Sequence, residues 1–250
     1  MNFSQLVESN NFESQFGLNM NSRLIVYLHI PKAAGNSSIK PIKEKFKSNL
    51  SIKWNEIEFS WSKFIEEQKS TNKYQFVSGH IHDKQIDLLK QSEINYYLIS
   101  FLRHPIKRIM SLYAYNTMES TPDSKKFKEK FVSFEDFAFN GVPPNSMSRQ
   151  LFRGCLSSTE GISKLYTKYN FIGLTEQFNF SMLLLSKILG FDFYNYKKLN
   201  VSKYNTTEMT LSFSLYKELE MRHSIDLEIY NKVKNDYVKL NESYIVTQLT

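Results

Sequence analysis

The sequence predicts an α/β protein with a central parallel sheet flanked by helices. Three apolar, β-favouring runs indicate strands at 24–28, 74–78 and 96–102, and each run stops at a short polar segment. Residues with helical apolar spacing follow the first and third of these segments. Strands and helices that alternate in this way form a parallel sheet covered by helices. Active sites of such proteins form at the edge where the strands end.

Length and composition indicate one globular domain. The chain has 250 residues, enough for a sizeable core, and its 41% hydrophobic and 15% aromatic content argues against disorder. Residues 1–22, rich in Asn, Ser and Gln, are predicted to form a loosely ordered N-terminal lead-in. Residues 23–250 are predicted to form the single domain.

Charge and cysteine use limit the partners and the compartment. The net charge of +7 suits a nucleotide, an acidic glycan or a nucleic acid, although dispersed surface lysines account for most of it. Cys155 is the only cysteine, which excludes an internal disulfide and favours a reducing compartment. The chain shows no signal-peptide pattern and no apolar run of membrane-spanning length. We therefore expect a soluble, cytoplasmic protein.

The segment after the first strand has the properties of an anion-binding loop. The strand ends before Pro31, and helical spacing begins again near Ile39. The first amides of such a helix point into the loop, and the helix dipole favours an anion there. The loop residues expected to contact a phosphate-like group are Lys32, Ala33, Ala34, Gly35, Asn36, Ser37 and Ser38. Lys32 precedes Gly35, which is not the order of a Walker A loop.

The second strand is followed by two histidines. Gly79-His80 places an imidazole at the rim of the sheet, and histidine is the natural general base near neutral pH. His80 is therefore the candidate base, with His82 as the reserve, although an isolated histidine is more often a packing or surface residue. A His-x-His pair can also suggest a metal ion, but no cysteine or carboxylate cluster accompanies it here, so we expect no metal.

The third strand ends at Arg103, and Pro105 is suited to the first turn of the helix that follows. Ser111 lies two turns into this helix. The planar guanidinium of arginine matches phosphate geometry. Arg103 and Ser111 are therefore expected to converge on one phosphate.

These motifs together resemble those of carbohydrate sulfotransferases. The 5′-phosphosulfate loop of that family has roughly the pattern HIPKTGGTS. Six residues match this pattern, namely His29, Ile30, Pro31, Lys32, Gly35 and Ser37, and three depart from it, namely Ala33, Ala34 and Asn36. The eight-residue spacing from Arg103 to Ser111 equals that of the family's 3′-phosphate motif. His80 matches the catalytic base of the hexuronic-acid 2-O-sulfotransferases.

The resemblance implies the sulfotransferase version of the P-loop NTPase-like fold and a defined reaction. The co-substrate would be 3′-phosphoadenosine 5′-phosphosulfate (PAPS), bound by the Lys32 loop, Arg103 and Ser111. Its sulfuryl group would pass to an acceptor hydroxyl, expected to be that of a carbohydrate, with His80 and Lys32 as catalytic residues. No nucleic-acid partner and no metal are implied.

The resemblance also implies an acceptor side. The segment 145–154 is similar to the family's Asn-x-Gln-x-Arg pattern, with Asn145 and Arg149 retained and Met147 where Gln is expected. We assign Asn145, Arg149 and His82 to acceptor binding. The departure at Met147 leaves the identity of the acceptor open, and the sequence does not indicate the oligomeric state.

The remaining predictions concern packing. Helices are expected at 62–68, 131–139 and 224–235, and the segment 171–190 is expected to be a strand followed by a helix. Residues 119–130 are expected to form an exposed excursion, and 199–202 resembles a family loop near the nucleotide.

Two other functions remain as alternatives. A P-loop-type kinase or nucleotide hydrolase needs a Gly-Lys-Ser/Thr order and a magnesium-binding acid after a strand, and neither is found. A non-catalytic protein that binds polyanions or glycans fits the basic charge, and its affinity would depend steeply on salt. It does not require a paired Lys32–Arg103 site.

Overall fold

The structure, a computed structural model, describes residues 2–8, 23–52, 59–193 and 209–249. Five parallel strands form one sheet in the order β2-β3-β1-β4-β5. The strands are β1 (Leu24–Leu28), β2 (Asn49–Ile52), β3 (Phe76–Gly79), β4 (Tyr96–Leu102) and β5 (Phe171–Leu174). The predicted α/β class with a central parallel sheet is confirmed.

The strand β1 lies in the middle of the sheet. All five of its residues are buried, as expected of a strand that is apolar on both faces. The register aligns Leu28 with Gly79 of β3 and with Ser100 of β4. Because the three strands run in the same direction, the segments that follow them meet at one edge of the sheet.

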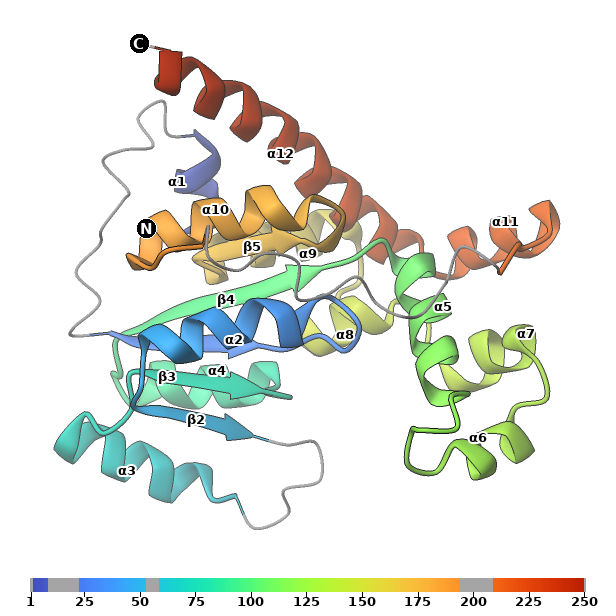
Figure 1. The fold of residues 1–250 in the computed structure, drawn as a ribbon, viewed down its shortest axis with the longest axis horizontal. Coiled ribbons are helices and arrows are strands. Elements are labelled where there is room, and N and C mark those ends of the chain that lie inside the picture. The colour runs from blue at the N-terminus through green and yellow to red at the C-terminus, as the bar shows by residue number, and fades with distance from the viewer. Residues whose placement is uncertain (1, 9–22, 53–58, 194–208, 250) are drawn as a thin grey trace.

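Helices cover both faces of the sheet. Figure 1 shows α2 (Gly35–Lys45) and α10 (Phe178–Leu189) on one face, and α4 (Asp83–Gln91) and α9 (Ser158–Lys168) on the other. The long helix α12 (Ser224–Leu249) packs against α9. This arrangement buries β1 and leaves the carboxyl edge of the sheet to the loops.

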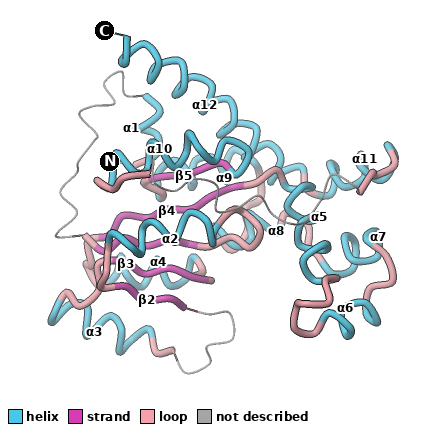
Figure 2. Tube along the Cα trace, in the orientation of Figure 1, coloured by secondary structure: helices cyan, strands magenta, loops and turns pink. Residues whose placement is uncertain are grey.

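A second, smaller hydrophobic cluster lies beyond that edge, where Figure 2 shows further helices gathered. The helix α5 (Pro105–Asn116) leads into this cluster directly from β4. The other contributors are α6 (Ser124–Lys130), α7 (Phe134–Asp136) with the π-helical turn Phe137–Gly141, and α11 (Phe213–Arg222). The helix α5 therefore joins the carboxyl edge of the sheet to the second cluster.

Two segments are more regular than the sequence predicted. The helix α1 (Phe3–Glu8) lies within the expected lead-in; Phe3 is fully buried, and its amide donates to the carbonyl oxygen of Tyr169 at 2.8 Å. The edge strand β2 was not predicted, because the sequence Asn-Leu-Ser-Ile has little strand preference of its own and depends on its pairing with β3.

Other predictions are confirmed with changed boundaries. The predicted helix at 62–68 is α3 (Trp61–Thr71), and the first helix begins at Gly35, before the helical apolar spacing that starts near Ile39. The exposed excursion contains α6, which has no buried residue. The segment 171–190 forms β5 and α10, and the predicted helix at 224–235 lies within α12.

Some predictions are not tested. The family-like loop at 199–202 lies outside the described residues. Within the described part of the chain, no helix has both the length and the apolar composition needed to cross a membrane. The cytoplasmic location and the domain boundary at residue 23 stay predictions.

Gly79, the last residue of β3, occupies a position that only glycine fits. Its φ is +149°, and a Cβ there would lie 2.1 Å from the carbonyl oxygen of Ile52 in β2. We expect Gly79→Ala to lower the free energy of unfolding by about 3 kcal/mol or more, because backbone strain and the clash add together. Urea denaturation with an unchanged m-value measures this loss.

Gly190→Ala is the matched control. Gly190 has a φ of +69°, but a Cβ there would meet nothing within 4 Å. We expect this substitution to cost only about 1–2 kcal/mol, the cost of the left-handed backbone. A loss in Gly79→Ala no larger than in Gly190→Ala would contradict the role of the close β2 backbone.

Candidate active site

The loop between β1 and α2 is compact and opens onto the carboxyl edge of the sheet. Two of its residues have left-handed backbone conformations, Lys32 with a φ of 67° and Ala34 with a φ of 60°. The amide of Ala33 donates to the carbonyl oxygen of Ile30 at 3.2 Å, which closes the turn. Because α2 begins directly at Gly35, its first-turn amides border this loop. The loop therefore has the geometry of an anion-binding turn.

Gly35 is required by the ring of His29. A Cβ at position 35 would lie 2.1 Å from two atoms of the His29 imidazole. The carbonyl oxygen of His29 accepts a hydrogen bond from Nε2 of Gln150 at 2.8 Å. The backbone amide of His29 donates to the carbonyl oxygen of Gly79 at 2.8 Å. His29 is thus held between the loop, β3 and α8 (Ser146–Phe152).

Arg103 and Lys32, 71 residues apart, meet at this edge. Nη1 of Arg103 donates to the carbonyl oxygen of Lys32 at 3.1 Å. Burial lowers the pKa of the Lys32 ammonium, and the positive charge of Arg103 lowers it further. Burial also lowers the pKa of the Arg103 guanidinium, while Glu176 opposes this shift. Two partly desolvated cations side by side form a strong site for an anion.

Glu176 orients the start of α5. Its Oε1 accepts a hydrogen bond from the backbone amide of His104 at 3.0 Å. The ring of His104 packs edge-on against Tyr230 of α12, with ring centroids 5.3 Å apart. Glu176 therefore orients the start of α5 beside Arg103.

Two serines predicted to contact the donor are buried. Ser38 has an exposed fraction of 0%, and its hydroxyl lies 2.6 Å from that of Tyr27. This hydroxyl also donates to backbone carbonyls of the loop, so it braces the start of α2. Ser111 is 4% exposed on α5. Of the other loop residues, Ala33 and Gly35 are buried and Asn36 is exposed.

The imidazole of His80 faces that of His29. The two rings are stacked with centroids 5.0 Å apart and an angle of 30° between their planes. Burial lowers the pKa of His80 below its usual range, and His82 lowers it further. Burial, with His80 and Lys32, lowers the pKa of His29 to about 4. Both rings are neutral near pH 7, which leaves His80 in the form that accepts a proton.

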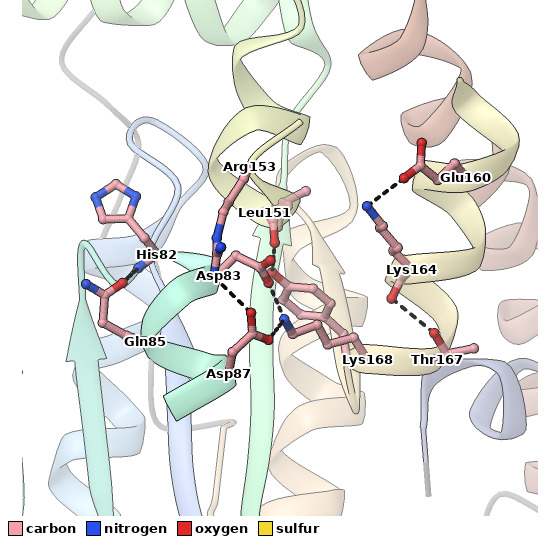
Figure 3. A network of polar contacts seen from close by, with 11 residues as sticks. His82, Asp83, Gln85, Asp87, Leu151, Arg153, Glu160, Lys164, Thr167 and Lys168 are labelled. Atoms are coloured by element: carbon pink, nitrogen blue, oxygen red, sulfur yellow. Dashed lines mark hydrogen bonds and ion pairs between the residues drawn. The ribbon is translucent and has the colours of Figure 1, made fainter. Parts of the chain in front are cut away.

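A charged network lies next to His82, at the start of α4 (Figure 3). Asp83 and Asp87 on α4 both accept from Nζ of Lys168 on α9, with a distance of 2.8 Å to Asp87. Arg153, next to α8, pairs with Asp87 at 2.9 Å. The amide of His82 donates to Oε1 of Gln85 at 3.0 Å, while its imidazole points away from the network. The network thus joins the helix after His80 to two other elements.

Asn145 and Arg149, two of the three residues assigned to acceptor binding, lie in different settings. Asn145 is bonded to the C-terminal helices. Its backbone amide donates to Nδ1 of His223 at 3.1 Å, and its side-chain Oδ1 accepts from the backbone amide of Asp226 at 3.3 Å. Arg149 is exposed, and its Nε donates to the carbonyl oxygen of Pro144 at 2.9 Å. Both residues line a pocket of about 310 Å³, together with Arg153.

A buried polar cluster behind the site was not predicted. Arg108 on α5, 4% exposed, donates to the hydroxyl of Ser146 and lies near Asp226. The carboxylate of Asp226 accepts from the amides of Met147 and Ser148, both at 2.8 Å, and so caps α8. The sequence carries one indication of it: Asp226 is an acidic residue among apolar residues of a helix that was assigned to packing alone. The cluster holds α5, α8 and α12 together.

His223 makes the stability of this cluster depend on pH. It is fully buried, and burial, with Arg108 and Arg222, lowers its pKa to about 4. Below pH 6.5 the unfolded chain binds a proton that the folded chain does not, so the stability falls with the pH down to about pH 4. His29 acts in the same direction. We expect a loss of about 1.4 kcal/mol per pH unit for each histidine within this window.

Thermal or urea unfolding between pH 7.5 and pH 5 measures this dependence. In His223→Gln the slope below pH 6.5 should be smaller than in the wild type by about 1 kcal/mol per pH unit. Burial raises the pKa of Asp226, which works in the opposite direction, so the test is kept above pH 5. Equal slopes in the variant and the wild type would show that His223 is not the titrating group.

No group of three or more His, Cys, Asp or Glu side chains that could hold a metal ion occurs in the residues that the structure describes. The loop and the arginine lie at neighbouring strand ends of a parallel sheet, which is the arrangement of a P-loop-like α/β protein.

The model of the sulfotransferase family matches residues 20–241. The chain therefore belongs to the sulfotransferase family, which confirms the predicted fold and the predicted class of enzyme, a PAPS-dependent sulfotransferase.

A comparison with curated proteins gave no match. Among solved structures, that of mouse sulfotransferase SULT7A1 complexed with PAP is similar, with 15% identity and a TM-score of 0.41 over 84% of this chain and 67% of that chain. A likeness at this level carries no information about the ligands of this chain.

Proposed function

We propose that this sulfotransferase binds PAPS at the edge formed by Lys32 and Arg103 and transfers its sulfuryl group to a carbohydrate hydroxyl. The observation that supports this most is the contact between Arg103 and the Lys32 loop, which brings together the motifs expected for the two phosphate groups of the donor. The loop amides and Lys32 would bind the 5′-phosphosulfate. Arg103 and Ser111 would bind the 3′-phosphate.

The proposed chemistry is an in-line displacement at sulfur. His80 takes the proton of the acceptor hydroxyl while its oxygen forms a bond to sulfur. The bond between sulfur and the bridging oxygen breaks, and 3′-phosphoadenosine 5′-phosphate (PAP) leaves with the additional negative charge on its 5′-phosphate. Lys32 and the loop amides would stabilise this charge as it develops. The lowered pKa of His80 supports its role, because the imidazole is neutral before the reaction.

The acceptor is proposed to be an acidic oligosaccharide or polysaccharide. Exposed Arg149 and nearby Arg153 give the pocket beside α8 two positive charges against one carboxylate, that of Glu160. His82, whose imidazole points away from the α4 network, is the other proposed acceptor contact. Asn145 would act mainly by fixing the start of α8, because its amide and side chain are bonded to His223 and Asp226.

The test is transfer of labelled sulfate from PAPS to a panel of acceptors in the presence of a metal chelator. The panel contains a uronic-acid polysaccharide, its neutral counterpart of equal chain length, and a small phenol. We expect product with the uronic-acid polysaccharide and little with the other two. Transfer to the phenol alone would contradict a carbohydrate acceptor. Binding of polysaccharide without transfer to any acceptor would favour the non-catalytic alternative.

A further inference from the structure

The ammonium of Lys32 lies over an aromatic ring. Its Nζ is 4.2 Å from the centroid of Tyr115, near the end of α5. A cation over an aromatic face is attracted by the negative potential of the ring, and the attraction grows as the cation loses water. Lys32 is partly desolvated and lies beside Arg103, and both effects disfavour its positive charge. The attraction to the ring offsets part of this cost.

The position of Tyr115 on α5 relates it to the proposed donor site. Tyr115 follows Ser111 by four residues, so both side chains project from the same face of the helix. The end of this helix is fixed, because the hydroxyl of Thr121 donates to the carbonyl oxygen of Tyr115 at 2.7 Å. Tyr115 is 38% exposed, at the border between the helix and solvent.

The backbone and the ammonium of Lys32 are therefore held from two directions. Arg103 binds its carbonyl oxygen from the end of β4, and Tyr115 contacts its ammonium from α5. A lysine side chain loses much rotamer freedom when it is fixed. If that freedom is already restricted before the donor arrives, less conformational entropy is lost when the donor binds and reacts.

We propose that Tyr115 is a positioning residue that holds the Lys32 ammonium on the Ser111 side of the loop before PAPS binds. This inference rests on the proposed function for its consequence in catalysis, but not for the contact itself. The aromatic face carries the interaction, and the phenolic hydroxyl is not needed. Phenylalanine at position 115 should therefore keep this positioning role, and leucine should lose it.

The first test measures the contact without any donor. In protein labelled with ¹³C at the lysine side chains, the resonance of Lys32 is assigned by its loss in Lys32→Arg. We expect the ε-methylene protons of Lys32 to be shifted upfield by the ring in the wild type and in Tyr115→Phe. In Tyr115→Leu they should move to the position of an ordinary lysine. An unshifted resonance in the wild type would overturn the proposal.

The second test measures the consequence. At saturating PAPS, Tyr115→Leu should lower kcat about two- to fivefold, the loss expected for one exposed cation–π contact, and Tyr115→Phe should leave it unchanged. The acceptor KM should not change in either variant. Wild-type kcat in Tyr115→Leu, or an equal loss in Tyr115→Phe, would overturn the positioning role. Absence of transfer by the wild type would refute the proposed function, and the first test would still decide whether Tyr115 holds Lys32.

Discussion

His80→Gln is expected to lower the turnover of sulfuryl transfer by about 10²–10⁴ and to leave the affinity for PAP within a factor of two. Glutamine keeps a polar side chain of similar reach but cannot accept a proton near neutral pH. The ring of His80 packs on His29 at the strand ends and takes no part in the Arg103 contact with the loop, so donor binding should not depend on it. Initial rates at saturating PAPS and calorimetric titration with PAP measure the two quantities.

The control for this prediction is His82→Gln. His82 is exposed, and its backbone amide donates to the Gln85 side chain, a bond that the substitution keeps; turnover should therefore change far less than in His80→Gln. The pH profile of the wild type gives a second check: because the base must be neutral, turnover should fall as the pH drops through the pKa of His80, below 6.5. A larger loss in His82→Gln than in His80→Gln would transfer the role of the base to His82.

Lys32→Met is expected to lower turnover by about 10²–10³, the effect of removing one group that stabilises the charge formed in the transition state. Methionine keeps most of the length of the side chain and removes its charge. Because Arg103 binds the backbone carbonyl of Lys32, the loop should keep its conformation in the variant. Turnover measured at several PAPS concentrations separates this loss from weaker donor binding.

Lys40→Met is the matched control, since Lys40 lies exposed on α2, next to the same loop in sequence. It removes an equal charge from the protein and should leave turnover unchanged. If both substitutions lower turnover equally, and high salt abolishes the difference from the wild type, the basic surface and not the Lys32 site would control the rate.

The fold was predictable where short-range patterns suffice. The strand at 96–102 and the helix from Pro105 were predicted at their observed boundaries, because an apolar run, a break and a proline follow one another there. The strand β2 was not predicted, because its pairing with β3 is a long-range contact that no pattern in its own four residues indicates. The same holds for α1, which two apolar side chains fix against a distant part of the chain.

The site was predictable in part for the same reason. Strand ends in a parallel sheet meet, so the proximity of the Lys32 loop and Arg103 followed from the order of the elements. The stacking of His29 on His80 and the contact of Lys32 with Tyr115 depend on side-chain directions, which spacing does not give. The cluster of Arg108 and Asp226 joins residues more than 100 positions apart, and no local pattern links them.

Calorimetric titration with PAP, compared between the wild type and Arg103→Ala, tests the central claim most directly. Arg153→Ala serves as the control, because Arg153 pairs with Asp87 on the network beside α4. The account predicts wild-type binding at about micromolar Kd, the same Kd in Arg153→Ala, and a loss of about 30-fold or more in Arg103→Ala, the effect of removing one partner of a charged contact. No binding to the folded wild type, or an unchanged Kd in Arg103→Ala, would contradict it.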